Sequence, residues 1–123
     1  MAKILVVEDD ESNRDMICRR LVRAGYEVVS ADDGAEGVRL VGEARPDLVL
    51  MDLALGAMDG WEATRLIRSD PTTSATPVIV LTVHALESDR RRSFEAGCND
   101  FETKPIELHR LLGKIQRQLS AAT

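Results

Sequence analysis

Three apolar runs and a short fourth segment, each followed at once by polar residues, constrain the fold of this chain most strongly. The runs are Ile4–Val7 before Glu8 and Asp9, Leu48–Met51 before Asp52, and Val78–Leu81 before Thr82; the fourth segment is Asp100–Thr103 before Lys104. Continuous aliphatic runs of this length are typical of strands that are buried on both faces of a parallel sheet. Ligand sites of such sheets lie beyond the carboxyl ends of the strands, where the strand order reverses. The sequence therefore predicts that three carboxylates, a hydroxyl and an ammonium group converge at one edge of a sheet.

Helical patterns alternate with these strands. After the first run, Ser12 is a candidate N-cap, apolar residues recur at helical spacing from Met16 to Ala24, and Gly25 ends the predicted helix. A second strand is expected at Tyr26–Ala31, and further helices at about Gly34–Glu43, Trp61–Arg68, Glu87–Ala96 and Leu108–Leu119. This alternation predicts a doubly wound α/β fold, a single domain over residues 1–123 with helices on both faces of the sheet. We expect the flavodoxin-like strand order 2-1-3-4-5, which places the crevice between the first and third strands.

The composition excludes several classes of function. The net charge of −5 and the isoelectric point near 5.0 argue against nucleic acid as a partner, because phosphate backbones require a basic face. No apolar stretch approaches the length of a membrane span and the chain shows no signal peptide, so we expect a cytoplasmic protein without membrane contact. Cys18 and Cys98 match neither a zinc site nor a redox pair, which indicates reduced thiols.

The clustered acids predict a metal site. Like charges a few ångströms apart repel each other, so such a cluster is costly unless a cation joins it. Oxygen ligands in a shallow, wet site favour Mg²⁺. A Mg²⁺ held by Asp9 and Asp52 could also bind a phosphoryl oxygen, while the Lys104 ammonium and the Thr82 hydroxyl contact the other oxygens. The chain has 13 arginines but only 3 lysines, which makes a lysine at this strand end more informative.

An acidic helix N-terminus is the simpler explanation for part of this cluster. Acidic side chains in a first helical turn are stabilised by the helix dipole, which accounts for Asp10 and Glu11. It does not account for Asp52 or Lys104, which stand at the ends of other predicted strands.

The motifs at these strand ends resemble those of the receiver domains of two-component response regulators. The matching segments, in order, are Leu5–Asp10, Leu50–Leu53, Met58–Gly60, Pro77–Thr82, Ala96–Gly97 and Lys104–Pro105. Each segment is modest alone, but their order and spacing together are specific and span essentially the whole chain.

The resemblance implies a phosphoacceptor and its metal ligands. Asp52 is similar to the aspartate that receives a phosphoryl group from a phosphohistidine of a partner protein. A protein of this kind assists its own phosphorylation and dephosphorylation and is not otherwise an enzyme. Asp9 resembles a direct Mg²⁺ ligand, Glu8 a ligand that acts mainly through water, and the main-chain carbonyl of Ala54 the third protein ligand.

The resemblance also implies a switch. Thr82 and Phe101 are similar to the pair in which the hydroxyl moves toward the phosphate and the ring turns inward. Lys104 resembles the phosphate-binding lysine of the family. Pro105 matches the position that is usually joined to this lysine by a cis peptide bond.

Two segments narrow the resemblance and bear on partners. Ser12–Arg14 and Met58–Arg65 are similar to receivers of hybrid kinases and of stand-alone phosphorelay regulators. Only Ser120–Thr123 follows the last predicted helix, so we expect no output domain. The implied phosphodonor is a histidine kinase or a histidine phosphotransfer protein. The implied downstream partner is a protein that binds the surface formed by residues 87–96, 100–103 and 106–119.

Three departures from the family pattern change what we expect of the site. Gly56 replaces the usual proline, which should loosen the loop after Asp52. Val83 replaces a small residue and should narrow the access to Asp52. Phe101 replaces the commoner tyrosine, so the ring lacks a hydroxyl. None of these departures removes a group that would take part in the chemistry.

Other interpretations differ in class. The chain could be a receiver detached from a hybrid histidine kinase, which the length of the natural gene product would decide. A phosphohydrolase with Asp52 as nucleophile would need a second acid where Ala54 stands. A flavin carrier of the same strand order would need a neutral phosphate loop, whereas Glu8–Glu11 would repel a phosphate. We reject the last two.

Two further features are assigned structural roles. Arg90–Arg92 is predicted to form a solvated helix face rather than a partner site. Trp61 is predicted to pack behind the active-site loop.

Overall fold

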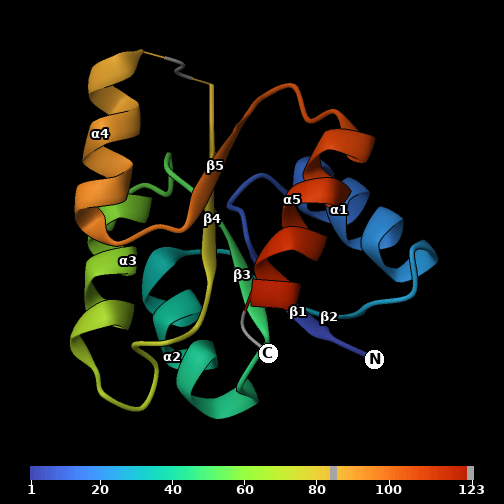
Figure 1. Cartoon of the computed structure of the whole chain (residues 1–123), viewed down its shortest axis with the longest axis horizontal. Helices are drawn as coiled ribbons and strands as arrows, with labels where there is room; N and C mark the ends of the chain where they lie inside the picture. The colour runs from blue at the N-terminus through green and yellow to red at the C-terminus, as the bar shows by residue number, and fades with distance from the viewer. Residues whose placement is uncertain (84–85, 122–123) are drawn as a thin grey trace.

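Five parallel strands form the centre of the molecule in the computed structural model, which describes residues 1–83 and 86–121. They are β1 (Lys3–Val7), β2 (Glu27–Ala31), β3 (Leu48–Asp52), β4 (Val78–Thr82) and β5 (Asp100–Thr103). Their order in the sheet is β2-β1-β3-β4-β5, which confirms the predicted order (Figure 1). All neighbouring strands pair in parallel, so their carboxyl ends lie at the same edge of the sheet.

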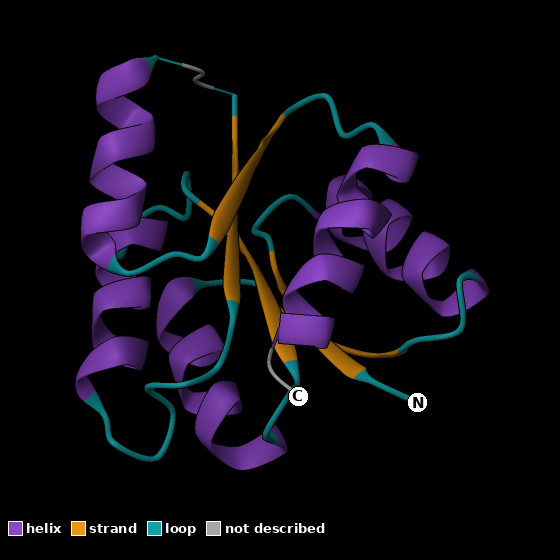
Figure 2. Cartoon of the chain, viewed as in Figure 1, coloured by secondary structure: helices purple, strands orange, loops and turns teal. Residues whose placement is uncertain are grey.

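Five helices cover the two faces of this sheet. They are α1 (Glu11–Arg23), α2 (Gly34–Ala44), α3 (Gly60–Ser69), α4 (Glu87–Ala96) and α5 (Leu108–Ala121). Helices α1 and α5 lie on one face and α2, α3 and α4 on the other (Figures 1 and 2). The predicted alternation of strands and helices is therefore correct, with element boundaries that differ by one or two residues.

The two apolar layers explain why the strand sequences are continuously hydrophobic. Ile4 and Val6 of β1 point into the layer that packs against α1 and α5. Leu5 and Val7 of the same strand point into the opposite layer, against α2 and α3. Every residue of β3 and β4 is buried. The central strands β1, β3 and β4 thus contribute to both cores, whereas the edge strands β2 and β5 are partly exposed.

The start of α1 differs from the prediction. The N-cap is Asp10 and not Ser12, because the Asp10 carboxylate accepts a hydrogen bond from the Asn13 backbone N–H at 2.9 Å. A carboxylate at this position also interacts favourably with the helix dipole, which a serine hydroxyl does not. Asp33 and Asp59 cap α2 and α3 in the same way. The prediction from the sequence did not include the extra stabilisation that a charged carboxylate gives as an N-cap.

Arg68 on α3 fixes the end of the sheet opposite the predicted site. Its guanidinium donates hydrogen bonds to the carbonyl oxygens of Gly97 at 2.8 Å and Thr76 at 2.6 Å. It also donates to the Asn99 side chain at 2.6 Å. One side chain therefore ties α3 to the C-terminal end of α4 and to the starts of β4 and β5.

The surface and the cysteines agree with the composition. Cys98 is buried, Cys18 is half-buried, and both are free thiols. Burial raises the pKa of the Cys98 thiol to about 12.

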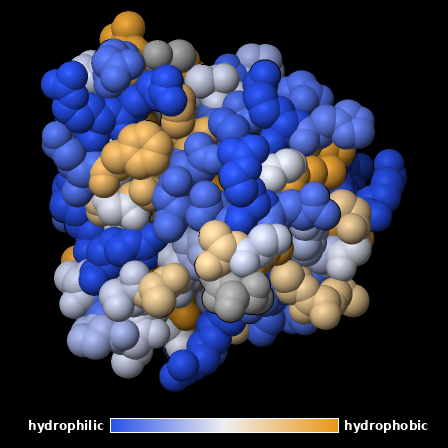
Figure 3. All heavy atoms as spheres, viewed as in Figure 1, coloured by the Kyte–Doolittle hydropathy of each residue, from blue (hydrophilic) through white to orange (hydrophobic). Residues whose placement is uncertain are grey.

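Among residues 1–83 and 86–121, no helix combines the length and apolarity needed to cross a membrane. The face shown in Figure 3 is mainly hydrophilic, with an apolar patch on the side of α4. Phe94 of α4 is exposed, and its ring centroid lies 6.5 Å from that of Phe101 on β5.

Gly60 provides a test of how tightly the fold is built around β3. A Cβ atom at Gly60 would lie 2.3 Å from the Asp52 carbonyl oxygen, whereas a Cβ at the exposed helical Gly113 would meet nothing within 4 Å. We expect Gly60→Ala to lower the free energy of unfolding by about 2 kcal/mol. Gly113→Ala should raise it by up to about 1 kcal/mol through helix propensity. Urea denaturation measures both, and a neutral Gly60→Ala would contradict the close approach.

Candidate functional site

The strand register brings the predicted site residues to one edge of the sheet. Val7 is opposite Met51, which places Glu8 beside Asp52, the last residue of β3. Thr82, the last residue of β4, is opposite Thr103, which precedes Lys104. The carboxylates, the hydroxyl and the ammonium group therefore occupy neighbouring strand ends, as the sequence predicted.

Three carboxylates converge at this edge. Glu8 and Asp52 are buried, with 1% and 3% of their surface exposed, whereas Asp9 is exposed. One oxygen from each of the three lies within 4.8 Å of the others. Two acids are thus withdrawn from water while the third faces it, an arrangement open to solvent on one side.

Lys104 supplies the positive charge of the cluster. Its Nζ lies 3.1 Å from Glu8 Oε2 and 3.1 Å from Asp52 Oδ2. Burial by itself would lower the pKa of Lys104, but the attraction of Asp52 and Glu8 outweighs burial and raises it. Burial, together with hydrogen bonding to and repulsion by Asp52, raises the pKa of Glu8 to about 7. One ammonium group is therefore not enough to hold the pKa of Glu8 at its ordinary value.

The cluster fits a divalent cation. With all three acids ionised, three negative charges face one positive charge, which leaves two negative charges unbalanced. The donors are all oxygens, the ligands that Mg²⁺ prefers. Both the charge and the chemistry of the residues present suit this ion.

The loop after Asp52 is ordered by its own backbone. The Ala54 N–H donates to Asp52 Oδ1 at 3.3 Å, and the Gly60 N–H donates to the Leu53 carbonyl at 3.1 Å. Gly56 has a φ of 81°, which proline cannot adopt because its ring fixes φ near −65°. The loop therefore has a backbone conformation at Gly56 that a proline at this position could not adopt.

Comparison with known proteins agrees with this geometry. A model of the response regulator receiver domain family matches residues 4–116. The chain belongs to this family. Protein PilH of Pseudomonas aeruginosa is 36% identical over 120 residues, which span 98% of this chain and 99% of PilH. The polar-differentiation response regulator DivK of Brucella anthropi is 34% identical, and the match spans 97% of this chain and 97% of DivK.

Solved structures place this receiver domain in the same fold. The receiver domain of a sensor histidine kinase from Pseudomonas aeruginosa, solved with a magnesium ion in its active-site cleft, is 38% identical with a TM-score of 0.90. The superposition covers 97% of this chain and 98% of that one. Other curated relatives are longer proteins, and this receiver domain spans about half or a quarter of their length.

The expected switch residues of the receiver domain belong to β4 and β5, with Thr82 at the strand end beside the carboxylates and Phe101 farther back along β5. Thr82 is buried, and Phe101, opposite Val80 in the sheet, is half-buried. The Lys104–Pro105 peptide bond is cis. The Arg90 guanidinium lies 4.6 Å from the Phe101 ring centroid and the Lys114 ammonium lies 5.4 Å from it. A ring without a hydroxyl is thus held through its π-face by two cations.

The three arginines of α4 are exposed, as predicted for a solvated helix face, but two of them also lie over aromatic rings. Arg90 lies over Phe101, and Arg92 lies over Trp61 with 4.0 Å between guanidinium carbon and ring centroid. Arg91 has only the solvated role that was predicted for all three. The sequence did not reveal these pairs because the arginines and the rings come from segments far apart in the chain.

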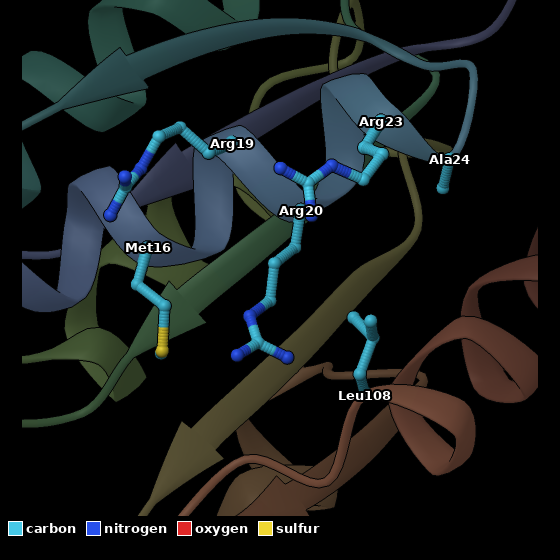
Figure 4. Close-up of a pocket in the computed structure, with 6 residues that line it drawn as sticks. All are labelled: Met16, Arg19, Arg20, Arg23, Ala24 and Leu108. Carbon is cyan, nitrogen blue, oxygen red and sulfur yellow. The ribbon is translucent and has the colours of Figure 1, made fainter.

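Two hollows flank α1, and one of them opens beside the site. A cavity of about 480 Å³ includes Lys104 and Val83 in its lining, together with Asn13, Met16, Ile17, Pro105 and Ile106. A second cavity of about 420 Å³ lies farther along α1, away from the carboxylates (Figure 4). Arg20 extends from α1 toward Leu108 at the start of α5, and Met16 lines both cavities. We call this surface, from Lys104 to Arg20, the α1–α5 groove.

The raised pKa of Glu8 predicts the response of the metal-free protein to pH. A carboxyl group whose pKa is higher in the folded than in the unfolded state stabilises the fold when protonated. This contribution is complete below the ordinary value of 4.5 and is lost as the pH rises through about 7. In chelator, the wild type should therefore lose more stability than Glu8→Gln between pH of about 5 and about 8.

The two proteins share every other titrating group, so the difference between their urea midpoints isolates Glu8. Parallel pH profiles for the wild type and Glu8→Gln would show that the pKa of Glu8 is not raised.

Proposed function

We propose that this receiver domain accepts a phosphoryl group on Asp52 in a Mg²⁺-dependent reaction and thereby changes its binding to partner proteins. The phosphodonor is the phosphohistidine of a histidine kinase or of a histidine phosphotransfer protein. The observation that carries this proposal is the position of the Asp52 carboxylate, which lies between Lys104 and an acidic cluster with ligand oxygens within 4.8 Å of one another.

The transfer exchanges one bond to phosphorus for another. A carboxylate oxygen of Asp52 forms a bond to phosphorus while the bond between phosphorus and the donor imidazole nitrogen breaks, and the imidazole takes up the electron pair. Glu8, Asp9, Asp52 and the Ala54 main-chain carbonyl are the residues that would hold Mg²⁺. When bound, this ion supplies the positive charge that offsets repulsion between the phosphoryl oxygens and the carboxylate.

Lys104 and Thr82 serve the product rather than the attack. Lys104 Nζ, now 3.1 Å from Asp52 Oδ2, is placed to move to a phosphoryl oxygen once that carboxylate has become an acyl phosphate. The Thr82 hydroxyl donates a hydrogen bond to another oxygen. Movement of Thr82 leaves room for Phe101 to turn inward, so the phosphate is sensed at β5.

A hydrolytic enzyme is the less favoured function. Asp52 could serve as the nucleophile of a phosphohydrolase, but the second residue after it is Ala54, which has no acid to protonate a leaving group. We therefore propose a signalling protein of the cytoplasm that assists its own phosphorylation and dephosphorylation. Its partners are proteins rather than nucleic acid, in keeping with the net charge of −5.

We also propose that this domain acts as a stand-alone regulator without an output domain. Support comes from PilH and DivK, each matched over at least 97% of its own length. The alternative is a module of a hybrid histidine kinase, the kind of protein suggested by the similar sensor-kinase receiver. Sequencing the complete natural transcript distinguishes the two.

Two surfaces are assigned to the two partners. The α1–α5 groove begins at Lys104 and continues along α1 to Arg20, so a donor helix that delivers a phosphohistidine to Asp52 could lie in it. Within residues 1–83 and 86–121, the Arg20 guanidinium makes no hydrogen bond or ion pair, so it is available to an acidic donor. The downstream target binds the surface of α4, β5 and α5, where Arg91 and Phe94 line a hollow of about 550 Å³.

Labelling by a small donor tests the chemistry directly. Acetyl phosphate should add one labile phosphate to the wild type only when Mg²⁺ is present, and none to Asp52→Ala. Lys104→Ala should still be labelled, more slowly, but should not switch, because Lys104 couples the phosphate to β5. Intact-mass analysis measures the number of phosphates added to each protein. Full labelling of Asp52→Ala would assign the phosphate to another residue.

Charge reversal tests the assignment of the two surfaces. Arg20→Glu should slow transfer from a phosphorylated histidine phosphotransfer protein about tenfold, in the range of one lost charge contact of about 1.4 kcal/mol. Labelling of the same variant by acetyl phosphate should be unchanged. Arg91→Glu on α4 is the matched control and should leave transfer unaffected. Equal effects of the two variants would rule out the α1–α5 groove as the donor site.

A further inference from the structure

A buried hydrogen-bond chain joins α3 to α4 behind the loop that follows Asp52. The Trp61 indole N–H donates to Ser93 Oγ at 2.9 Å, and the Ser93 hydroxyl donates to the Asp89 carbonyl at 2.9 Å. Ser93 is only 1% exposed, and its two partners, Trp61 and Asp89, are half-buried. The Arg92 guanidinium covers the other side of the contact, 4.0 Å from the Trp61 ring centroid. Breaking the chain would leave a buried polar group unpaired.

The other end of this connection is fixed at Asp52. Gly60, immediately before Trp61, is packed so closely that a Cβ would lie 2.3 Å from the Asp52 carbonyl oxygen. The Gly60 N–H donates to the Leu53 carbonyl, and the Gly60 carbonyl accepts from Thr64 Oγ1 at 2.7 Å. The backbone between Asp52 and Trp61 is therefore clamped at both Asp52 and Gly60. A displacement of the Asp52 backbone must move Gly60, and with it the base of the Trp61 side chain.

We infer that Trp61 is a positioning residue that couples the state of Asp52 to α4 through Ser93. This inference rests on the proposed phosphorylation of Asp52 and adds a second connection to it. The connection runs through β3 and α3, whereas the expected switch runs through Thr82 on β4 and Phe101 on β5.

The two connections meet on one helix. Arg90 and Arg92, two residues apart on α4, lie over Phe101 and Trp61, the aromatic residues of the two connections. A shift of α4 therefore changes both stacks together. Because the two rings belong to different elements, Trp61 to α3 and Phe101 to β5, the position of α4 reflects the sum of two inputs from Asp52.

The intrinsic fluorescence of the protein provides the first test. Trp61 is the only tryptophan of the chain, so all tryptophan emission reports on this contact. Beryllofluoride with Mg²⁺, a mimic of the phosphoryl group, should change the emission of the wild type. The same change should fall at least twofold in Ser93→Ala, which keeps the ring but removes the hydroxyl acceptor. An emission change that is identical in Ser93→Ala, or absent from the wild type once the mimic is bound, would overturn the inference.

Amide exchange provides a second test that does not depend on tryptophan emission. Trp61→Phe keeps an aromatic ring but removes the N–H donor together with part of the ring area, so it is compared with Ser93→Ala, which leaves the ring intact. On addition of beryllofluoride, its α4 amides should respond at most half as much as in the wild type, while β5 still responds through Thr82 and Phe101. Arg91→Gln, between the two stacked arginines, is the matched control and should respond like the wild type. A full α4 response in Trp61→Phe would show that Trp61 only packs.

Fluorine NMR separates the inference from the function on which it rests. A bound beryllofluoride signal that requires Mg²⁺ and is lost in Asp52→Ala supports phosphorylation at Asp52. If that signal never forms, the proposed function fails. If it forms equally in the wild type, Trp61→Phe and Ser93→Ala while α4 responds equally in all three, the function stands and the role of Trp61 fails.

Discussion

The contact of the Lys104 ammonium with two buried carboxylates is the interaction on which the rest of this structure depends. Glu8 and Asp52 come from different strands and are both almost inaccessible to water. Removing two ionised acids from water costs several kcal/mol each unless a partner charge compensates. Lys104, 3.1 Å from both, supplies that charge and so fixes β1 and β3 relative to the segment after β5. The compensation is incomplete, which is why the pKa of Glu8 is raised and why a cation suits the site.

The strand order makes this contact possible. In the sheet, the strands follow one another in the order β1-β3-β4-β5. Lys104, which follows β5, must therefore reach across the end of β4 to contact Glu8 and Asp52. The last residue of β4 is Thr82, so this short side chain stands at the strand end that the lysine crosses. The same residue is the hydroxyl that is expected to move when Asp52 is modified. The contact of Lys104 and the proposed signalling therefore both depend on the side chain at position 82.

The sequence was sufficient to predict the sheet and its functional edge for a physical reason. Runs such as Val78–Leu81 must be buried on both faces, and parallel strands bring their carboxyl ends together, so Asp52, Thr82 and Lys104 could be placed as neighbours without coordinates. Ser12 is a candidate cap of α1 by residue type, whereas the Asp10 carboxylate accepts the capping hydrogen bond and also gains from the helix dipole. The stacks of Arg90 and Arg92 on aromatic rings were missed because an exposed arginine has the same local pattern whether or not a distant ring lies beneath it.

The hydrogen bonds of Arg68 have a mechanical consequence for α4. This side chain binds the carbonyl of Gly97, the residue that ends α4, and ties it to Thr76 and Asn99 at the far side of the sheet. The contacts that we propose to respond to Asp52 lie instead along the body of the helix, at Arg90 and Ser93. Helix α4 is thus held at its C-terminal end, so any tilt of the helix turns about that end. Small movements at the strand edge are magnified toward its N-terminal turn at Glu87, far from the fixed point.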